Sequence, residues 1–151
     1  MIIRQATITD VHTISSLVNY YARQDRMLFR SMANIYKNLL SFMVAEENDK
    51  VLGCCTLEVI WADLAEIKSL AVEKEQNSRG IGKALIKSAI EKAKQLHIAR
   101  LFALTLEPAF FEKLGFEEIS KQKLPMKVWK DCAECPKQDH CDETAVIIRI
   151  V

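Results

Sequence analysis

The sequence contains few residues that break regular structure and has almost no net charge. Only 4 glycines and 3 prolines occur among 151 residues, and no stretch rich in glycine, serine and proline divides the chain. Domain boundaries usually fall in such stretches. A chain of this length also fits one compact hydrophobic core. We therefore expect a single domain over residues 1–151.

The charge balance and the lack of long apolar runs exclude several classes of partner. Lysine plus arginine number 21 and aspartate plus glutamate 20, which gives a net charge of +1 and no basic footprint for nucleic acid. No hydrophobic run is long enough to cross a bilayer, and the first residues lack the basic and then apolar pattern of a signal peptide. We expect a cytoplasmic protein with neither a nucleic-acid nor a membrane partner.

Half of the residues are hydrophobic, and their spacing alternates between strand and helix periods. A β-meander is expected first, followed by alternating helices and strands, which predicts a mixed α/β domain around one central sheet. Helices are predicted at residues 11–21, 33–41, 80–96 and 109–114, with a helical turn after residue 125. Strands are predicted at residues 1–8, 42–46, 51–61, 64–72, 100–105, 116–120 and 144–150, with a hairpin turn at 47–50.

The segment from residue 66 to residue 85 carries the most chemical information. A strand leads into a loop, and the loop opens a long helix with Gly80 and Gly82 at its mouth. Unbonded N–H groups at a helix N-terminus attract phosphate, and glycine lets the phosphate approach them. Arg79 and Lys83 add positive charge, so the pattern indicates a pyrophosphate cradle. A helix start without any ligand stays open as the alternative, and the spacing fits neither the dinucleotide fingerprint nor a P-loop.

Two motifs in this order resemble those of the GNAT acetyltransferases. Residues 77–82 read Asn-Ser-Arg-Gly-Ile-Gly and match the pyrophosphate loop R/Q-x-x-G-x-G/A except at Asn77. Residues 110–116 read Phe-Phe-Glu-Lys-Leu-Gly-Phe and match the second signature F-Y-x-x-x-G-F. The resemblance implies the acyl-CoA N-acyltransferase fold, a mostly antiparallel central sheet with a splayed strand pair and flanking helices. It also implies acetyl-CoA as the co-substrate of an N-acetyltransferase that requires no metal.

A narrower resemblance covers nearly the whole chain. Residues 27–31, 61–67, 102–105 and 124–129, together with the cysteine-containing segment 132–143, are similar to the single-domain bacterial N-acetylglutamate synthases. The implied acceptor is the α-amine of an amino acid, foremost L-glutamate, in arginine biosynthesis. Another small amine, a protein N-terminus, or a non-catalytic acyl-CoA-binding sensor stays open as an alternative, and so does a homodimer.

The resemblance assigns roles to individual residues. Glu66, at the start of the splayed strand, is the expected general base, although an ordinary ion pair is the alternative role for its carboxylate. Backbone amides around Leu70 and Val72 are expected to bind the pantetheine arm and the thioester oxygen. The full set expected to bind the cofactor is Leu70, Ala71, Val72, Asn77, Ser78, Arg79, Gly80, Ile81, Gly82, Lys83, Ala84 and Phe111.

Further residues are needed to bind the acceptor and to assist the departure of the thiolate. Arg30 is the preferred ligand for a substrate carboxylate because arginine binds carboxylates through two parallel hydrogen bonds. Lys68, Thr105 and Lys127 complete the predicted substrate-binding set, with solvated surface cations as the alternative for the lysines. The family often places a tyrosine, its general acid, where this chain has Phe111. No general acid is therefore assigned, and the thiolate can leave unprotonated because its pKa is about 8.5.

Five cysteines complete the inventory. Cys132, Cys135 and Cys141 cluster near the C-terminus as candidate zinc ligands, free thiols or a redox-sensitive pair, and the spacing with His140 departs from the usual zinc pattern. No metal is therefore assigned. Cys54 and Cys55 lie in a predicted strand, where Cys55 is expected to be ordinary core.

Overall fold

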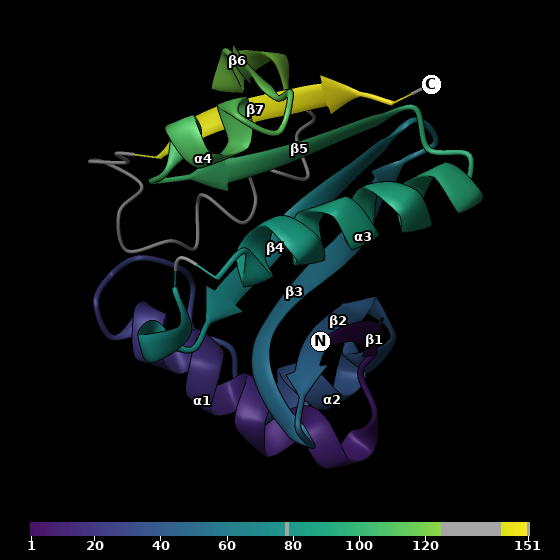
Figure 1. Ribbon diagram of the computed structural model, residues 1–151. Coiled ribbons are helices and arrows are strands. Elements are labelled where there is room, and N and C mark those ends of the chain that lie inside the picture. The colour runs from purple at the N-terminus through teal and green to yellow at the C-terminus, as the bar shows by residue number, and fades with distance from the viewer. Residues whose placement is uncertain (78, 125–142, 151) are drawn as a thin grey trace. The chain divides into compact units, whose positions relative to one another are not determined.

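The computed structural model describes residues 1–77, 79–124 and 143–150 (Figure 1). The backbone divides into two compact units. The first unit comprises residues 1–58 and 67–92, and the second comprises residues 59–66 and 93–151. Strands β3 (Lys50–Trp61) and β4 (Leu64–Val72) run through both units. The single-domain prediction stays a prediction, and the two units are described separately below.

The sheet is mostly antiparallel, as the family resemblance implied. Within the described residues its seven strands follow the order β1-β2-β3-β4-β5-β7-β6. The β4–β5 pair is parallel, and the β1–β2, β2–β3, β5–β7 and β6–β7 pairs are antiparallel. The remaining strands are β1 (Ile2–Gln5), β2 (Phe42–Glu47), β5 (Arg100–Thr105), β6 (Glu117–Ile119) and β7 (Thr144–Arg149).

In the first unit, the two faces of the sheet are covered by different helices. The helices are α1 (Val11–Ala22), α2 (Met32–Lys37) and α3 (Ile81–Gln95). Side chains alternate between the faces of a strand. Val44 and Cys54 accordingly belong to the core formed with α1 and α2. Their neighbours Met43 and Cys55 contact Ser88 and Leu85 of α3. The alternation of β2 and β3 thus places α1 and α2 on one face and α3 on the other.

Helix α3 approaches β3 closely at Gly53. A Cβ at this position would lie 3.0 Å from the Ile81 side chain, 3.2 Å from that of Leu85 and 3.3 Å from the carbonyl oxygen of Ala71. A larger residue would displace the first turn of α3, because packed interiors tolerate little added volume. The missing side chain of Gly53 therefore fixes where the N-terminus of α3 lies relative to the end of β4.

The second unit is built around the antiparallel strands β5, β7 and β6. In the register, Arg100 lies opposite Arg149, and Thr105 lies opposite Thr144. Helix α4 (Pro108–Glu112) packs near β6 and β7. The core of this unit is made by Leu64, Phe102, Leu124 and Ala145.

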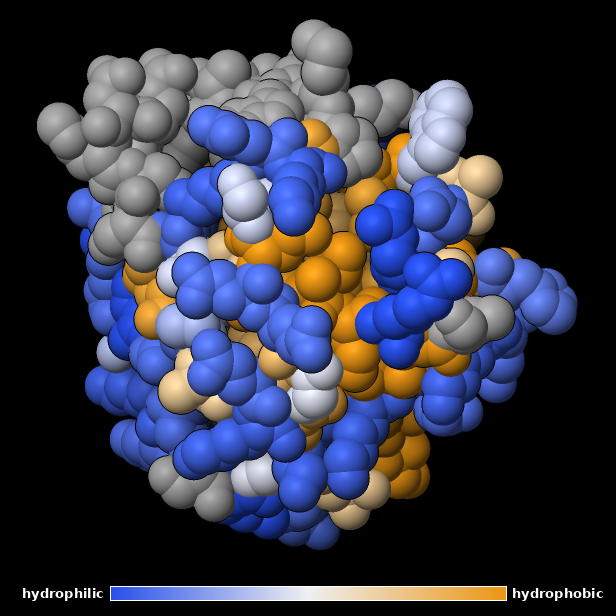
Figure 2. Space-filling view, turned by 90° about the horizontal axis from the view of Figure 1, so that it is seen from above, coloured by the Kyte–Doolittle hydropathy of each residue, from blue (hydrophilic) through white to orange (hydrophobic). Residues whose placement is uncertain are grey.

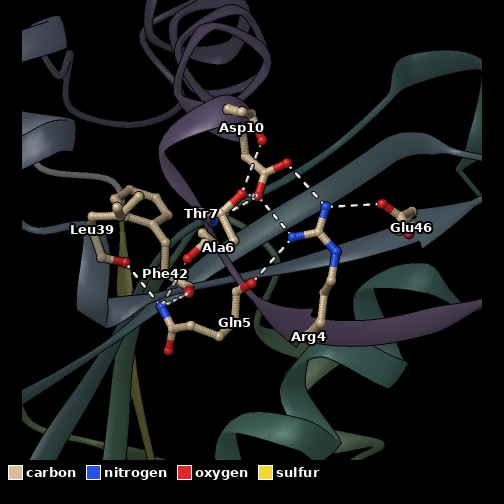
Figure 3. Close-up of polar contacts among 9 residues, drawn as sticks. Arg4, Gln5, Ala6, Thr7, Asp10, Leu39, Phe42 and Glu46 are labelled. Atoms are coloured by element: carbon tan, nitrogen blue, oxygen red, sulfur yellow. Dashed lines mark hydrogen bonds and ion pairs between the residues drawn. The ribbon is translucent and has the colours of Figure 1, made fainter.

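A cluster of ionic and polar side chains joins β1 to the start of α1 (Figure 3). The Arg4 guanidinium donates to both carboxylate oxygens of Asp10, at 2.8 and 3.0 Å, and to Glu46 on β2 at 2.9 Å. The Asp10 carboxylate also accepts the backbone N–H of Thr7 at 2.7 Å. These bonds hold the Asp10 pKa below its usual value, with the hydrogen bond from Arg4 as the main cause. The cluster is structural, since it ties the first strand to the first helix.

Local details confirm most of the expected elements and shift some boundaries. The β2–β3 turn consists of Asn48 and Asp49 with φ values of 53° and 61°, a two-residue hairpin turn that suits these residue types. The expected helix at 33–41 is shorter, because α2 ends at Lys37 and a 3-10 turn covers Leu39–Ser41. Cys55 is buried in the core, as predicted, and so is Cys54.

The surface mixes charged and hydrophobic side chains, and Figure 2 shows one face on which apolar atoms lie open between hydrophilic ones. The most exposed large hydrophobic residues of the described chain include Leu40 at 80%, Phe29 at 70% and Trp61 at 65%. Among the described residues, none of the helices has both the length and the apolar composition needed to cross a bilayer.

Replacing Asp10 by Asn should lower the free energy of unfolding at pH 7 by about 1–3 kcal/mol, because hydrogen bonds to charged groups contribute roughly that much. Arg4 depresses the pKa of Asp10 in the folded state. The stabilisation is therefore complete above the ordinary aspartate pKa of about 3.9 and is lost as pH falls through the lower folded-state value. Denaturant titrations from pH 7 to pH 2 should show wild type and variant converging below about pH 4.

The exposed turn residue Asp49 provides the control, because Asn also tolerates its left-handed backbone. Asp49→Asn should leave the free energy of unfolding within about 0.5 kcal/mol of wild type. A wild-type advantage over Asp10→Asn that stays constant down to pH 2 would contradict the assigned role of the Arg4–Asp10 bond.

Candidate functional site

The loop between β4 and α3 has the backbone geometry of an anion site. Gly80 has a φ of +79°, and a Cβ placed on it would meet no atom within 4 Å, so the space beside the loop is open. The helix begins with the hydrogen bond from Ala84 N–H to the Gly80 carbonyl at 3.0 Å. Earlier N–H groups of an α-helix have no intrahelical acceptor. Such N–H groups at a helix start are donors of the kind that a pyrophosphate requires.

Arg79 is exposed beside this loop and is held by a carboxylate of the β2–β3 hairpin. Its guanidinium donates to both oxygens of Glu47, at 2.8 and 3.0 Å, and to the Gln76 side chain at 2.7 Å. The hydrogen bond from Arg79 lowers the pKa of Glu47. Asn77, the departure from the loop motif, donates its side chain to the Lys74 carbonyl at 3.2 Å. Lys83 is exposed in the first turn of α3.

The end of β4 is fixed from two sides. The Tyr21 hydroxyl donates to the Val72 carbonyl at 2.6 Å, and the Glu73 N–H donates to the Leu52 carbonyl at 2.8 Å. A groove of about 180 Å³ lies here between α1 and residues 72–74. These contacts hold the strand end from which the loop departs.

A partly buried polar cluster surrounds Ser69 in the middle of β4. Ser69 has a φ of +52°, which an extended strand does not contain. Arg30, only 9% exposed, donates from Nε to Ser69 Oγ at 2.8 Å and from Nη2 to Glu58 at 2.6 Å. Its Nη1 donates to the Asn34 side chain at 2.9 Å. The structure thus places the predicted substrate ligand Arg30 among three protein acceptors.

The thiols of Cys54 and Cys55 on β3 are unreactive. Burial raises the pKa of the Cys54 thiol to about 12, and it raises the pKa of Cys55 as well. A thiol with such a pKa stays protonated at neutral pH and is a poor nucleophile. Cys54 and Cys55 are therefore unsuited to carry an acyl group.

The second unit contains three further predicted residues. Glu66 on β4 is only 3% exposed and lies opposite Phe102 in the parallel register with β5. Thr105, at the end of β5, accepts the Glu107 N–H at 2.8 Å. Phe111 is buried and makes edge-to-face contacts with Phe110 and Phe116, which is the packing role expected of a buried aromatic residue. Its predicted contact with the cofactor stays a prediction.

The predicted residues are therefore distributed over both units. The first unit contains Arg30, Lys68, Leu70, Ala71, Val72, Asn77, Arg79, Gly80, Ile81, Gly82, Lys83 and Ala84, and the second contains Glu66, Thr105 and Phe111. Ser78, Lys127, Cys132, Cys135 and Cys141 lie outside the described residues. Within residues 1–77, 79–124 and 143–150, no group of three or more metal-binding side chains is found.

Sequence reasoning missed the residues that support the site. These residues support the site through backbone conformation or through contacts between segments that are distant in the sequence. They are Ser69, Glu58, Asn34 and Tyr21. Nothing in the local pattern around Ser69 distinguishes it from an ordinary strand residue. Only the polar Thr56 and Glu58 in the hydrophobic run of β3 indicated that polar partners are buried nearby.

A family model described as the acetyltransferase (GNAT) family matches residues 8–116. This chain belongs to the GNAT acetyltransferase family. It is 39% identical over 145 residues to an uncharacterized N-acetyltransferase of Chlorobaculum tepidum, which covers 96% of this chain and 94% of that one. It is 35% identical over 133 residues to the amino-acid acetyltransferase of Mycobacterium tuberculosis, covering 86% of this chain and 76% of the other.

Solved structures agree with this assignment. The N-acetylglutamate synthase of Neisseria gonorrhoeae, complexed with coenzyme A and N-acetyl-glutamate, matches with a TM-score of 0.90 and 29% identity. The match covers 99% of this chain but only 35% of that longer one. The predicted GNAT fold is confirmed, and the protein is an acetyltransferase that uses acetyl-CoA.

Replacing Gly80 by Ala should weaken the binding of CoA about fivefold, because the free loop relaxes from the left-handed conformation and a residue with a Cβ regains it on binding at a cost of roughly 1 kcal/mol. The open space beside Gly80 means that this effect comes from the backbone and not from a steric clash. Isothermal titration calorimetry with CoA measures the change.

Gly115 provides a matched control, since it also has a positive φ, +98°, but lies in the second unit. Gly115→Ala should lower the melting temperature and leave the dissociation constant of CoA within about twofold. Equal loss of CoA affinity in both variants would show that general destabilisation, and not the loop, sets the binding.

Proposed function

We propose that this protein transfers the acetyl group of acetyl-CoA directly to the α-amine of an amino acid, with L-glutamate as the leading acceptor. In this proposal residues 1–151 act as one cytoplasmic N-acetyltransferase domain that supplies N-acetylglutamate for arginine biosynthesis. The observation that carries it is the left-handed Gly80 at the start of α3, eight residues after the end of the strand that bears Glu66. The likeness to amino-acid acetyltransferases supports the choice of acceptor.

The loop residues fit acetyl-CoA, which supplies an acetyl group activated as a thioester. Backbone N–H groups at the start of α3 would hold the pyrophosphate, with Arg79 and Lys83 adding positive charge. Arg79 is already ordered by Glu47 at 2.8 Å, so its guanidinium lies beside the loop before any anion arrives. Apart from Phe111, the rest of the predicted cofactor set lies in the same segment from Leu70 to Ala84.

Glu66 is the proposed general base. An α-amine has a pKa near 8, so much of it is protonated at neutral pH and cannot attack a carbonyl carbon. The carboxylate of Glu66 would accept this proton, directly or through water, before the amine nitrogen forms its bond to the acetyl carbon. The second proton that the nitrogen loses as the amide forms is released to solvent. A buried position suits this role because few competing waters reach the carboxylate, and Glu66 is only 3% exposed.

The backbone amides of Leu70 and Val72 are the proposed donors to the acetyl oxygen as negative charge develops on it. The thiolate then departs, and its pKa of about 8.5 lets it leave without an acid at neutral pH. Phe111 cannot donate a proton, so no general acid is assigned. The unreactive thiols of Cys54 and Cys55 favour direct transfer over an acyl-cysteine route.

The acceptor's carboxylates need cationic or polar partners. Lys68, half-buried in β4, and Thr105, at the end of β5, remain proposed substrate ligands, and Lys127 joins them from outside the described residues. The three protein acceptors around Arg30 favour a positioning role for this residue. A homodimer remains part of the proposal to be tested by solution mass.

The alternatives differ in the acceptor or in the chemistry. A different small amine or a protein N-terminus would keep the donor and change the acceptor. A non-catalytic acyl-CoA sensor would keep binding and lose turnover, and the phenylalanine at position 111 is the feature that favours it.

Thiol release from acetyl-CoA, measured across the twenty amino acids and spermidine, tests the proposal. Turnover should be fastest with L-glutamate. Replacing Glu66 by Gln should lower kcat about a hundredfold or more, because a positioned general base contributes roughly 10²–10⁴-fold. The control is Glu117→Gln, an exposed carboxylate of β6, which should leave kcat within about twofold.

Two other outcomes would each support one of the alternative functions. Turnover with spermidine and with no amino acid would retain the acetyltransferase and reject the amino-acid assignment. A higher melting temperature with acetyl-CoA but no thiol release with any acceptor would identify a binding protein instead.

A further inference from the structure

Ser69 has a backbone conformation that its position and residue type both disfavour. It lies within β4, yet its φ is +52°, in the left-handed region. The other non-glycine residues with positive φ in the described chain are Asp25, Asn48, Asp49 and His97, which belong to the types that tolerate this region. Such strain persists only where the surroundings enforce it, and it gathers at functional sites.

The peptide groups on both sides of Ser69 are held by side chains. The Thr56 hydroxyl lies 3.1 Å from the Lys68 carbonyl oxygen, and the Cys54 thiol lies 3.6 Å from the Ser69 carbonyl oxygen. The Ser69 side chain is fixed as well, because its Oγ accepts the Arg30 Nε–H at 2.8 Å. Rotation of the backbone at Ser69 would break these contacts.

Both the side chain and the backbone of Arg30 are held by hydrogen bonds. Its guanidinium also donates to Glu58 at 2.6 Å and to Asn34 at 2.9 Å, and it lies over the Phe42 ring at 5.2 Å. The Asn19 side chain accepts the Arg30 N–H at 3.1 Å and donates to the Arg30 carbonyl at 2.9 Å. This cluster lies entirely within the first unit. Each nitrogen of the Arg30 guanidinium donates to a protein acceptor. The side chain is therefore suited to orient Ser69.

We propose that Arg30 is a positioning residue that acts through Ser69. Its bond to Ser69 Oγ holds β4 in the left-handed turn and so sets the direction of the next peptide N–H, that of Leu70. This inference rests on the proposed function, in which the Leu70 amide donates to the acetyl oxygen. A donor that stabilises developing charge must be aimed before the reaction begins. Arg30 therefore acts on kcat, and not on the binding of a substrate carboxylate.

Two substitutions at Ser69 separate this role from others. Ser69→Ala removes the hydroxyl that Arg30 holds and keeps a Cβ, which disfavours positive φ. Ser69→Gly removes the same hydroxyl but accepts positive φ without support. Ser69→Ala should lower kcat about tenfold with the acceptor KM changed less than about twofold, whereas Ser69→Gly should stay within about threefold of wild type.

Replacing Arg30 by Lys provides the second comparison, because lysine keeps the charge next to Glu58 but lacks the rigid fork of donors. Arg30→Lys should lower kcat about tenfold in the wild-type background and much less in the Ser69→Gly background. Arg149→Lys, on the exposed end of β7, is the control and should change neither kcat nor KM.

Three results would overturn the inference. Equal losses in Ser69→Ala and Ser69→Gly would mean that the hydroxyl matters and the turn does not. Unchanged kcat in Ser69→Ala would remove the turn from the reaction. An acceptor KM that rises in Arg30→Lys by the same factor in both backgrounds, with kcat constant, would return Arg30 to carboxylate binding.

A second measurement needs no turnover and so separates this inference from the proposed function. The residual dipolar coupling of the Leu70 N–H, which reports the direction of that bond, should keep its wild-type value in Ser69→Gly and change in both Ser69→Ala and Arg30→Lys. If wild type acetylates no amino acid, the proposed function fails, and the couplings still decide whether Arg30 holds the turn. Identical Leu70 couplings in all four proteins would reject the positioning role.

Discussion

The close approach of α3 to β3 over Gly53 is the packing constraint on which the candidate site depends. The first turn of the helix lies against a strand residue that has no side chain, and the carbonyl of Ala71 lies 3.3 Å from where a Cβ would be. The end of β4 and the start of α3 therefore both lie against Gly53. The loop between them begins the helix with Gly80 in the left-handed conformation. Packing in the core thus places the N–H groups that are proposed to hold a pyrophosphate.

Two arginine clusters in the first unit show how the same chemistry serves different ends. Arg4 binds Asp10 and Glu46 and ties together elements that are close in the fold. Arg30 also binds a carboxylate, that of Glu58, but its Nε is directed to a strained residue of the strand that bears the proposed base. A paired arginine next to ordinary backbone stabilises the fold, whereas one next to a left-handed strand residue can serve function. The two roles are distinguished by the conformation of the backbone next to each arginine.

The sequence predicted the mixed α/β fold well, because its elements depend on local patterns, and the proposed phosphate loop rests on a local pattern too. Three of these patterns can be recognised in the sequence alone. They are the alternation in β2 and β3, the apolar stripe of α3 and the paired glycines at residues 80 and 82. The Arg30 cluster could not be predicted in this way. The sequence favours Arg30 as a ligand for a substrate carboxylate, and that role stays a prediction. An arginine in a loop gives no sign of partners 28 and 39 residues away along the chain. The positive φ of Ser69 was equally hidden, because serine carries no signal for a left-handed backbone.

The central claim is that acetyl-CoA donates to the α-amine of an amino acid, and the most direct measurement follows the acetyl group itself. Isotope-labelled acetyl-CoA is incubated with the protein and an equimolar mixture of the twenty amino acids and spermidine, and the products are identified by mass spectrometry. The account predicts labelled N-acetylglutamate as the main product, with the label on the α-nitrogen. Label on spermidine alone, or on no acceptor, would contradict it.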